Sequence, residues 1–141
     1  MAKRRKNGKG PPLSGDYLVD WHFRLILDVI YRQIISIKKK RVLTNPDVKN
    51  PQKRRETLYG LYDYETKEIF ISASKCKHPT KMSMVRALIH EIYHKITPEI
   101  FHNRIYRIEN ILMTRFTDEQ KRYLKKFIPR HEVKKGPTPA E

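Results

Sequence analysis

Hydrophobic residues recur at helical spacing in three stretches of the chain. The first stretch runs from Asp16 to about Ile37, although its β-branched residues leave room for an extended segment at its end. Its apolar positions are Leu18, Trp21 or His22, Leu25, Ile26, Val29, Ile30, Ile34 and Ile37. The second stretch contains Met84, Val85, Leu88, Ile89, Ile92 and Ile96, and the third, from Pro98 to about Arg115, contains Ile100, Phe101, Ile105, Ile108, Ile111 and Leu112. The pattern predicts three amphipathic helices.

The second helix has recognisable ends. Thr80 or Ser83 can cap its first turn, and Pro98 lies just beyond its expected last residue. A shorter helix is predicted after Asp118. These signals place the boundaries of the helical half of the chain.

A different, alternating pattern between residues 58 and 73 predicts a β-hairpin. Leu58, Gly60, Tyr62 and Tyr64 share one face of the first strand, and Ile69, Ile71 and Ala73 share a face of the second. The segment from Asp63 to Thr66 supplies the turn residues between them. A strand just before the second helix is expected to lie at the rim of a cleft, where its free edge can pair with an extended peptide. The alternative is a hairpin that only covers the core.

Length and composition predict one domain with polar tails. The chain has 141 residues, of which 38% are hydrophobic and 33% charged. We expect a basic tail over residues 1–14, a domain over residues 15–130 that includes a basic loop at 38–57, and a C-terminal tail over residues 131–141. No apolar run reaches transmembrane length, and the single cysteine, Cys76, fits a reducing compartment. The expected location is cytoplasmic, with association with a nucleoid or a virion.

The second helix carries the chemistry of the chain. It contains one His-Glu-x-x-His pattern, formed by His90, Glu91 and His94. Residues four apart lie on one helix face, so both imidazoles can reach a single Zn²⁺, and Glu91 can act as general base toward a water. The apolar stripe falls on another face, which predicts a helix that is buried on one side and binds metal on the other. The alternative is an ordinary amphipathic helix with two surface histidines.

A catalytic zinc site needs a third protein ligand. The third helix offers Glu99, His102 and Glu109, of which His102 and Glu109 lie two turns apart on one face. We favour Glu109, because it lies among isoleucines, where an unpaired carboxylate would be costly to bury. His102 is the alternative ligand. If Glu109 does not bind metal, we expect it to be exposed or to form a salt bridge with Arg86 or Arg107.

In these features the chain resembles the minimal zincin metallopeptidases, in particular small, gluzincin-like, single-domain members of phage and archaeal type. The resemblance covers about Leu58 to Leu124: the hairpin, the helix with Leu88-Ile-His-Glu-Ile-Tyr-His94, and a helix with Ile108-Glu-Asn110. It implies an α+β fold with an N-terminal helix that backs a small, mostly antiparallel sheet, followed by the metal-binding helix and a glutamate-bearing helix. It also implies Zn²⁺ ligands at His90, His94 and Glu109, with Glu91 as the general base.

The charge of the chain suggests a second kind of partner. The net charge is +16, and the basic residues form clusters in the predicted tail and loop. The candidates for nucleic-acid contact are Lys3, Arg4, Arg5, Lys6, Lys38, Lys39, Lys40, Arg41, Lys53, Arg54 and Arg55. Such clusters release counterions from phosphates and bind nucleic acid without sequence preference. The alternative is a solvated, lysine-rich surface.

Two functions therefore compete. The first is a zinc-dependent peptidase that hydrolyses peptide bonds of a protein or peptide substrate with a metal-activated water, acting on or near nucleic-acid-bound proteins. Tyr93, His102 or Tyr106 is expected to donate a hydrogen bond in the transition state. The second is a non-catalytic, nucleic-acid-binding structural or regulatory protein on a zincin scaffold.

Overall fold

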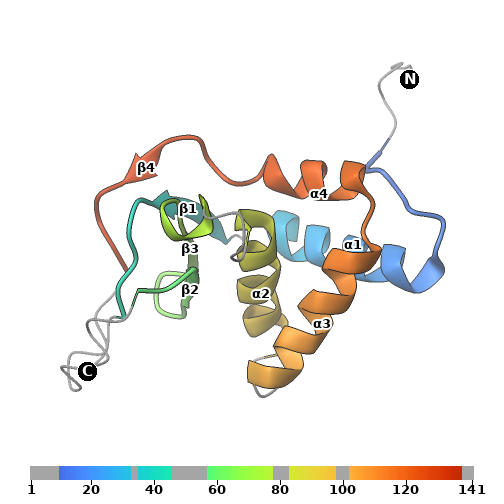
Figure 1. The fold of residues 1–141 in the computed structure, drawn as a ribbon, viewed down its shortest axis with the longest axis horizontal. Helices are drawn as coiled ribbons and strands as arrows, with labels where there is room; N and C mark the ends of the chain where they lie inside the picture. The colour runs from blue at the N-terminus through green and yellow to red at the C-terminus, as the bar shows by residue number, and fades with distance from the viewer. Residues whose placement is uncertain (1–9, 33–34, 46–56, 78–82, 98–101, 138–141) are drawn as a thin grey trace.

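The computed structural model describes residues 10–32, 35–45, 57–77, 83–97 and 102–137, which form an α+β fold with a four-stranded sheet (Figure 1). The helices are α1 (Tyr17–Arg32), α2 (Met84–Ile96), α3 (His102–Arg115) and α4 (Asp118–Lys125), with a short 3₁₀ turn, η2 (Lys75–Lys77). The strands are β1 (Ser36–Lys40), β2 (Gly60–Asp63), β3 (Glu68–Ser72) and β4 (Glu132–Val133).

The sheet has the strand order β2-β3-β1-β4 and is mostly parallel. β1 pairs in parallel with β3, with Ile37 opposite Ile69, and with β4, with Lys39 opposite Glu132. The prediction of a mostly antiparallel sheet was therefore wrong. The reason is that the first helix ends at Arg32 and the chain then becomes extended, so that the start of the predicted basic loop is a central strand.

The predicted hairpin is confirmed. β2 and β3 are antiparallel, with Tyr62 opposite Ile69. In the turn between them, the Asp63 carboxylate accepts a hydrogen bond from the Glu65 backbone N–H at 3.0 Å, and Lys67 has a positive φ of 59°. Ile69, Ile71 and Tyr62 belong to the main hydrophobic core, which fixes the face that this hairpin turns toward the helices.

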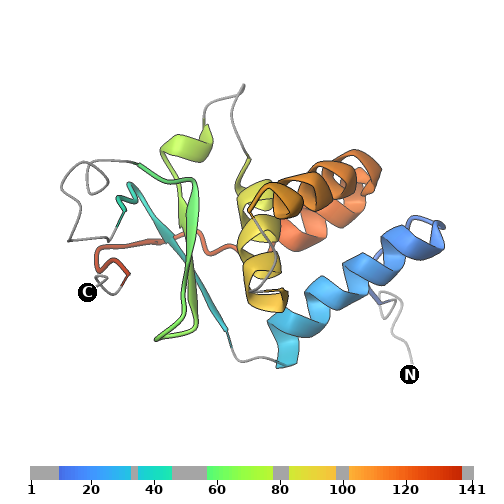
Figure 2. The same cartoon turned by 90° about the horizontal axis from the view of Figure 1, so that it is seen from below.

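Helix α2 lies between the sheet and the other helices (Figure 2). It packs against β2 and β3 on one side and contacts α1, α3 and α4 on the others. The expected N-terminal backing helix, α1, instead packs on α2 and α3. The physical reason is that α2 has buried residues around most of its circumference, including Ala87, Leu88, Ile89 and Ile92, so it occupies the centre of the fold.

None of the helices in the described part of the chain is both long and apolar enough to cross a membrane.

Candidate active site

The local sequence fixes where α2 begins and ends. The Ser83 hydroxyl caps the helix by accepting a hydrogen bond from the Arg86 N–H at 3.1 Å, whereas the other predicted cap, Thr80, lies outside the described residues. At the far end, the Thr97 hydroxyl donates to the Tyr93 carbonyl at 2.8 Å. The thirteen-residue helix between these caps carries the whole His-Glu-x-x-His pattern.

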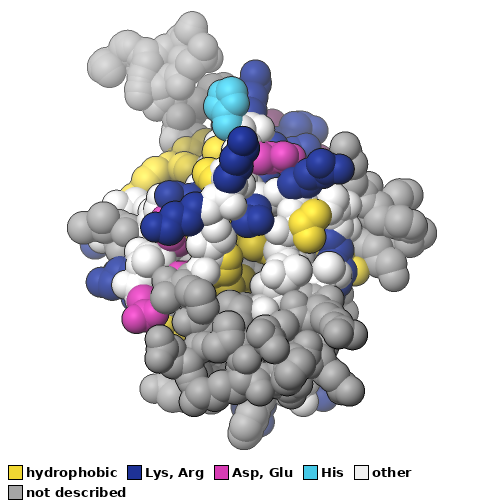
Figure 3. All heavy atoms as spheres, turned by 90° about the vertical axis from the view of Figure 1, so that its left-hand side faces the viewer, with side chains coloured by type: hydrophobic (Ala, Val, Ile, Leu, Met, Phe, Trp, Pro, Cys, Tyr) yellow, Lys and Arg dark blue, Asp and Glu magenta, His cyan; other side chains and the backbone are white. Residues whose placement is uncertain are grey.

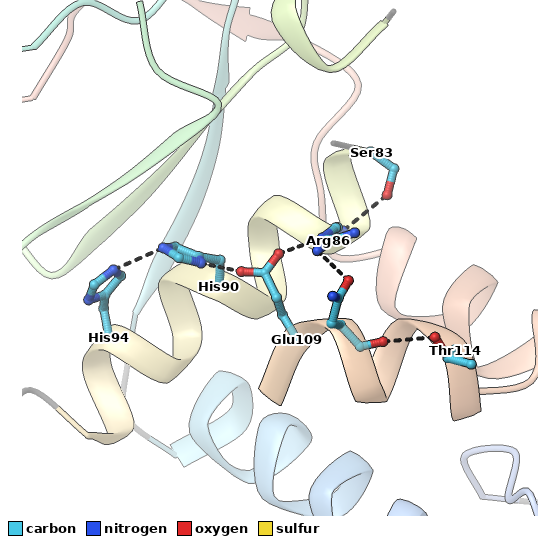
Figure 4. Close-up of polar contacts among 7 residues, drawn as sticks. Ser83, Arg86, His90, His94, Glu109 and Thr114 are labelled. Atoms are coloured by element: carbon cyan, nitrogen blue, oxygen red, sulfur yellow. Dashed lines mark hydrogen bonds and ion pairs between the residues drawn. The ribbon is translucent and has the colours of Figure 1, made fainter. Parts of the chain in front are cut away.

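The two histidines of the pattern point their Nε2 atoms at one another. The Nε2 atoms of His90 and His94 are 3.0 Å apart, and their rings meet nearly edge to face (Figure 4). Two nitrogens bound to one tetrahedral zinc at about 2.0–2.1 Å would lie about 3.3 Å apart. The pair therefore fits a shared zinc ion after a shift of a few tenths of an ångström.

The other ring nitrogen of His90 contacts Glu109. The Nδ1–H of His90 donates to Glu109 Oε1, and Arg86 Nε donates to Glu109 Oε2 at 2.6 Å. Arg86 Nη2 also donates to Asn110 Oδ1 at 2.6 Å, which holds the guanidinium in place (Figure 4). Because a carboxylate only accepts, His90 donates to Glu109 through its Nδ1–H, and its Nε2 is the atom directed at His94.

The position of Glu109 differs from the predicted one. Glu109 is fully buried, and it meets His90 on the Nδ1 side of the ring, away from His94. The salt bridge to Arg86, the alternative that we gave for this residue, is present. Among the described residues, no group of three His, Cys, Asp or Glu is close enough to hold a metal. The side chain of His102, the other predicted ligand, lies outside what the structure describes; its backbone begins α3.

Glu91 lies beside the histidine pair and against the sheet. It is 7% exposed, and its carboxylate accepts a hydrogen bond from the backbone N–H of Tyr62 in β2. Burial, with a smaller effect of Glu109, raises the pKa of Glu91 to about 7, against the lowering effects of His90 and of the Tyr62 N–H. A carboxyl with a pKa near neutrality can both accept and return a proton.

The three residues of the pattern line a pocket of about 480 Å³. The opposite wall comes from the chain just before and within β2, with contributions from η2 and α3. The remaining lining residues are Asn45, Thr57, Leu58, Tyr59, Gly60, Leu61, Tyr62, Tyr64, Lys75 and Tyr106. The pocket thus combines a carboxylate and two imidazoles with an aromatic wall, as ligand pockets commonly do.

The structure separates the tyrosine candidates for a hydrogen-bond donor. Tyr93 is buried and its hydroxyl contacts His22 Nδ1 of α1, so it links two helices and does not line the pocket. Tyr106 does line the pocket, and its ring centroid lies 4.7 Å from that of His90. Burial raises the pKa of Tyr106, so the phenol keeps its proton at neutral pH and can donate.

The predicted nucleic-acid residues are only partly described. Lys3, Arg4, Arg5 and Lys6, like Lys53, Arg54 and Arg55, lie outside the described residues. Lys38, Lys39 and Lys40 lie in β1 and Arg41 follows it, but Lys38 forms an ion pair with Glu68 at 2.7 Å and Lys40 Nζ donates to the Val42 carbonyl at 3.2 Å. Two of these four basic side chains are therefore already engaged within the protein.

Two features of the site were not predicted from the sequence. The first is the contact between Glu109 and His90. These residues lie on two separate helices, and their spacing in the sequence does not show how the two helices are aligned. The second is Lys75, which lies in η2 and lines the pocket. A single lysine after a strand matches no motif that would predict this position.

Comparison with known proteins gave no match to a protein-family model, to a curated protein or to a solved structure.

Proposed function

We propose that this protein is a zinc-dependent peptidase. The observation that carries the proposal is the pair of Nε2 atoms, 3.0 Å apart, next to the buried carboxylate of Glu91 in a pocket of about 480 Å³. An ordinary amphipathic helix with two surface histidines would not bury His90 to 4% exposure and hold it with an ion-paired carboxylate. His90 and His94 would hold the metal, and His102 is the remaining candidate for a third ligand, because the two oxygens of Glu109 contact Arg86 and the Nδ1 of His90.

Each residue of the site then has a task in the hydrolysis. A bound zinc ion supplies a Lewis acid that lowers the pKa of water and polarises the scissile carbonyl. Glu91 accepts a proton from the attacking water while the water oxygen bonds to the carbonyl carbon. Glu91 then returns that proton to the leaving nitrogen as the C–N bond breaks. The Tyr106 hydroxyl donates to the carbonyl oxygen as negative charge develops on it. Arg86 and Glu109 keep the His90 ring oriented.

Strand β2 supports a peptide rather than a small molecule as substrate. It is an edge strand of the sheet, and its residues Gly60, Leu61 and Tyr62 line the pocket next to Glu91. Among the described strands only β3 pairs with it, and on its other edge the Tyr62 N–H donates to Glu91, so a peptide that pairs with this edge would lie beside that carboxylate. We infer that the substrate lies along β2 with its scissile bond over Glu91.

The test compares the purified wild-type protein with Glu91→Gln and with His94→Ala. We expect one zinc ion per chain, by elemental analysis, in the wild type and in Glu91→Gln, and weakened binding in His94→Ala. Hydrolysis of a denatured protein mixture, followed by mass spectrometry of new chain ends, should fall at least about 100-fold in Glu91→Gln. Glu65→Gln, an exposed glutamate in the hairpin turn, is the matched control. Equal cleavage by wild type and Glu91→Gln would refute the peptidase.

His102→Ala in the same series tests the third ligand. If His102 is that ligand, the variant should lose its zinc at neutral pH, and in the presence of chelator it should melt at the same temperature as the wild type. Unchanged zinc content in His102→Ala would mean that, of the residues considered, only the two histidines bind the metal.

The second candidate function is nucleic-acid binding, without catalysis or alongside it. It is favoured by the surface of the molecule on the side of β1 and β4, where Lys and Arg side chains are spread with few acidic side chains between them (Figure 3). A net charge of +16 would draw such a surface to phosphates.

A further inference from the structure

We propose that Lys75 forms an anion-binding subsite in the pocket and that it selects peptides with a carboxylate near the scissile bond. The inference rests on the proposed function for the idea that a peptide occupies the pocket, and it does not require that the peptide be cleaved. It assigns a role to a residue that belongs neither to the His-Glu-x-x-His pattern nor to its hydrogen-bond partners.

Lys75 is held in a defined position. Its Nζ donates to the Thr57 carbonyl at 2.6 Å and lies 3.2 Å from the Thr57 hydroxyl, and it sits 4.6 Å from the centre of the Tyr59 ring. A cation at this distance from an aromatic ring is attracted to its face. A long, flexible lysine side chain therefore has its ammonium group placed at the pocket wall before any ligand binds.

Backbone hydrogen bonds also hold Lys75 and the segment that it contacts. The Tyr59 carbonyl accepts from the Ser72 N–H at 2.8 Å, and the Leu58 N–H donates to the Leu43 carbonyl at 2.9 Å. The Lys75 N–H itself lies 3.3 Å from the Ser72 hydroxyl. The subsite is thus attached to β3 and to the start of β2, which also position the neighbouring Glu91.

The charge of Lys75 is not neutralised within the described part of the protein. An ammonium group has three N–H donors, and the contacts with Thr57 use two. No Asp or Glu of the described residues forms an ion pair with Lys75, and Glu91 is the only carboxylate among the lining residues that are described. The third N–H can therefore donate to a ligand, and an anion is the partner that gains most from it.

The position of Lys75 along the wall sets the distance to the scissile bond. Two contacts locate Lys75 and Glu91 along the segment that leads into β2. Lys75 contacts Thr57, and three residues later a Cβ at Gly60 would lie 3.3 Å from Glu91 Oε2. The chain bends at Tyr59 between these two contacts, so the three residues span at most about 10 Å. For a peptide that follows β2, the selected carboxylate should lie within about three residues of the bond next to Glu91.

Binding of uncleaved peptides tests the subsite. The full-length protein with Glu91→Gln, loaded with zinc, is titrated with acetyl-hexaalanine-amide peptides that carry either Glu or Gln at each position in turn. At one position we expect the Glu peptide to bind about tenfold more tightly than its Gln partner, as for one charged hydrogen bond. An additional peptide with six alanines and a free C-terminal carboxylate shows whether the carboxylate comes from a side chain or from the chain end.

Variants separate the subsite from other effects of charge. Lys75→Met should abolish the preference for Glu over Gln, and Lys75→Arg should keep it. Lys125→Met removes the same charge from an exposed position on α4 and should leave the preference unchanged. If Lys75 only supported the fold, Lys75→Met would lower stability without changing the ratio of the two affinities.

The results distinguish this inference from the proposed function. Equal affinity for Glu and Gln at every position, absence of measurable binding to any peptide, or a preference that survives Lys75→Met would overturn the subsite. A preference that depends on Lys75 in a protein that cleaves no peptide would retain the subsite and reject the peptidase. Cleavage without any preference for Glu over Gln would retain the peptidase and reject the subsite.

Discussion

The contact between Glu109 and His90 shows how one buried carboxylate can fix the orientation of a histidine ring. Glu109 has no exposure to solvent, and its two oxygens contact the His90 Nδ1 and the Arg86 Nε. Burying a carboxylate is costly unless it is paired and hydrogen-bonded, and here both conditions are met. The result is a histidine with a fixed ring orientation and a fixed tautomer.

Replacing Glu109 by Gln should weaken zinc binding without removing the side chain's volume. The amide is neutral, so it supports the His90 N–H less strongly and leaves Arg86 without its ion-pair partner. We expect the zinc affinity to fall about 10- to 100-fold, as for other partners of metal-binding histidines. Competition with a chelating indicator measures the change. Glu68→Gln, which breaks the ion pair with Lys38 in the sheet, should leave the affinity unchanged; an equal loss in both variants would contradict the proposed role.

At the level of elements, the close approach of β2 to α2 gives the pocket its shape. Gly60 makes this approach possible, because a Cβ there would lie 3.1 Å from the Phe70 carbonyl oxygen and 3.2 Å from Glu91 Cγ. Both contacts are tighter than ordinary van der Waals distances. The absence of a side chain at residue 60 therefore allows the short distance between β2 and the Glu91 side chain.

Gly60→Ala should reduce hydrolysis more than it reduces stability. The added methyl group has to displace either β3 or the Glu91 side chain, and the side chain is the more movable of the two. We expect a loss of about 1–3 kcal/mol in unfolding free energy, as for overpacking, with a larger relative loss of kcat. Gly10→Ala is the control, since no atom lies within 4 Å of a Cβ there. Urea unfolding measures the loss of stability, and peptide hydrolysis measures the loss of kcat. Unchanged hydrolysis would show that the reaction does not depend on the close approach of β2 to Glu91.

A second set of contacts between elements joins the segment before α1 to α4. Asp20 accepts hydrogen bonds from the Ser14 N–H and hydroxyl, both at 2.8 Å, from the Gly15 N–H at 3.1 Å and from Gln120 Nε2 at 3.0 Å. Gln120 is fully buried and also forms the capping box of α4 with Thr117. Burial alone would raise the pKa of Asp20, but these hydrogen bonds outweigh it and the pKa is lowered.

The lowered pKa of Asp20 predicts a stability contribution that disappears in acid. The charged carboxylate stabilises the fold at pH values above the ordinary pKa of 3.8, and this contribution is lost as the pH falls through the lower pKa of the folded state. Asp20→Asn should be less stable than wild type by about 1–3 kcal/mol at pH 7, as when charged hydrogen bonds are removed. The difference should shrink as the pH falls below 3.8.

Urea unfolding across this pH range measures the difference. Asp28→Asn, at a partly exposed site paired with Arg32, should change stability little at any pH. A difference between wild type and Asp20→Asn that stays constant with pH would contradict the assignment.

At the scale of the whole molecule, the charge of +16 is the dominant long-range feature. It produces a positive field around the protein whatever the individual contacts are. Such a field favours acidic substrates in the pocket as well as phosphates on the surface. The proposed anion subsite and the proposed nucleic-acid binding would therefore both be favoured by the same positive field.

Nucleic-acid association predicts binding that weakens steeply with salt. For a fluorescent duplex of random sequence, the logarithm of the binding constant should fall linearly with the logarithm of the salt concentration, by about 0.9 for each phosphate contacted. Arg41→Gln should reduce this slope by about one contact. Arg32→Gln, at the end of α1 and paired with Asp28, is the matched control. A slope near zero in the wild type would exclude nucleic acid as a partner.

The sequence by itself determined the features that depend on local spacing. The proximity of His90 and His94 follows from residues four apart on a helix, and the β2–β3 hairpin follows from alternation with a turn at Asp63. The helix ends at Ser83 and before Pro98 were likewise set by neighbouring residues. Such features can be predicted from the sequence because both partners lie within a few residues of one another.

Only the tertiary structure decided which distant groups meet. Periodicity did not show that β1 would join β3 in parallel, because a strand's partner depends on the packing of the whole sheet. Nor did it show that Glu109 would reach His90 from the Nδ1 side or that Lys75 would enter the pocket wall. The relative rotation of α2 and α3 fixes the contact between Glu109 and His90, and the path of the chain after β3 fixes the position of Lys75. Both result from the packing of the core as a whole.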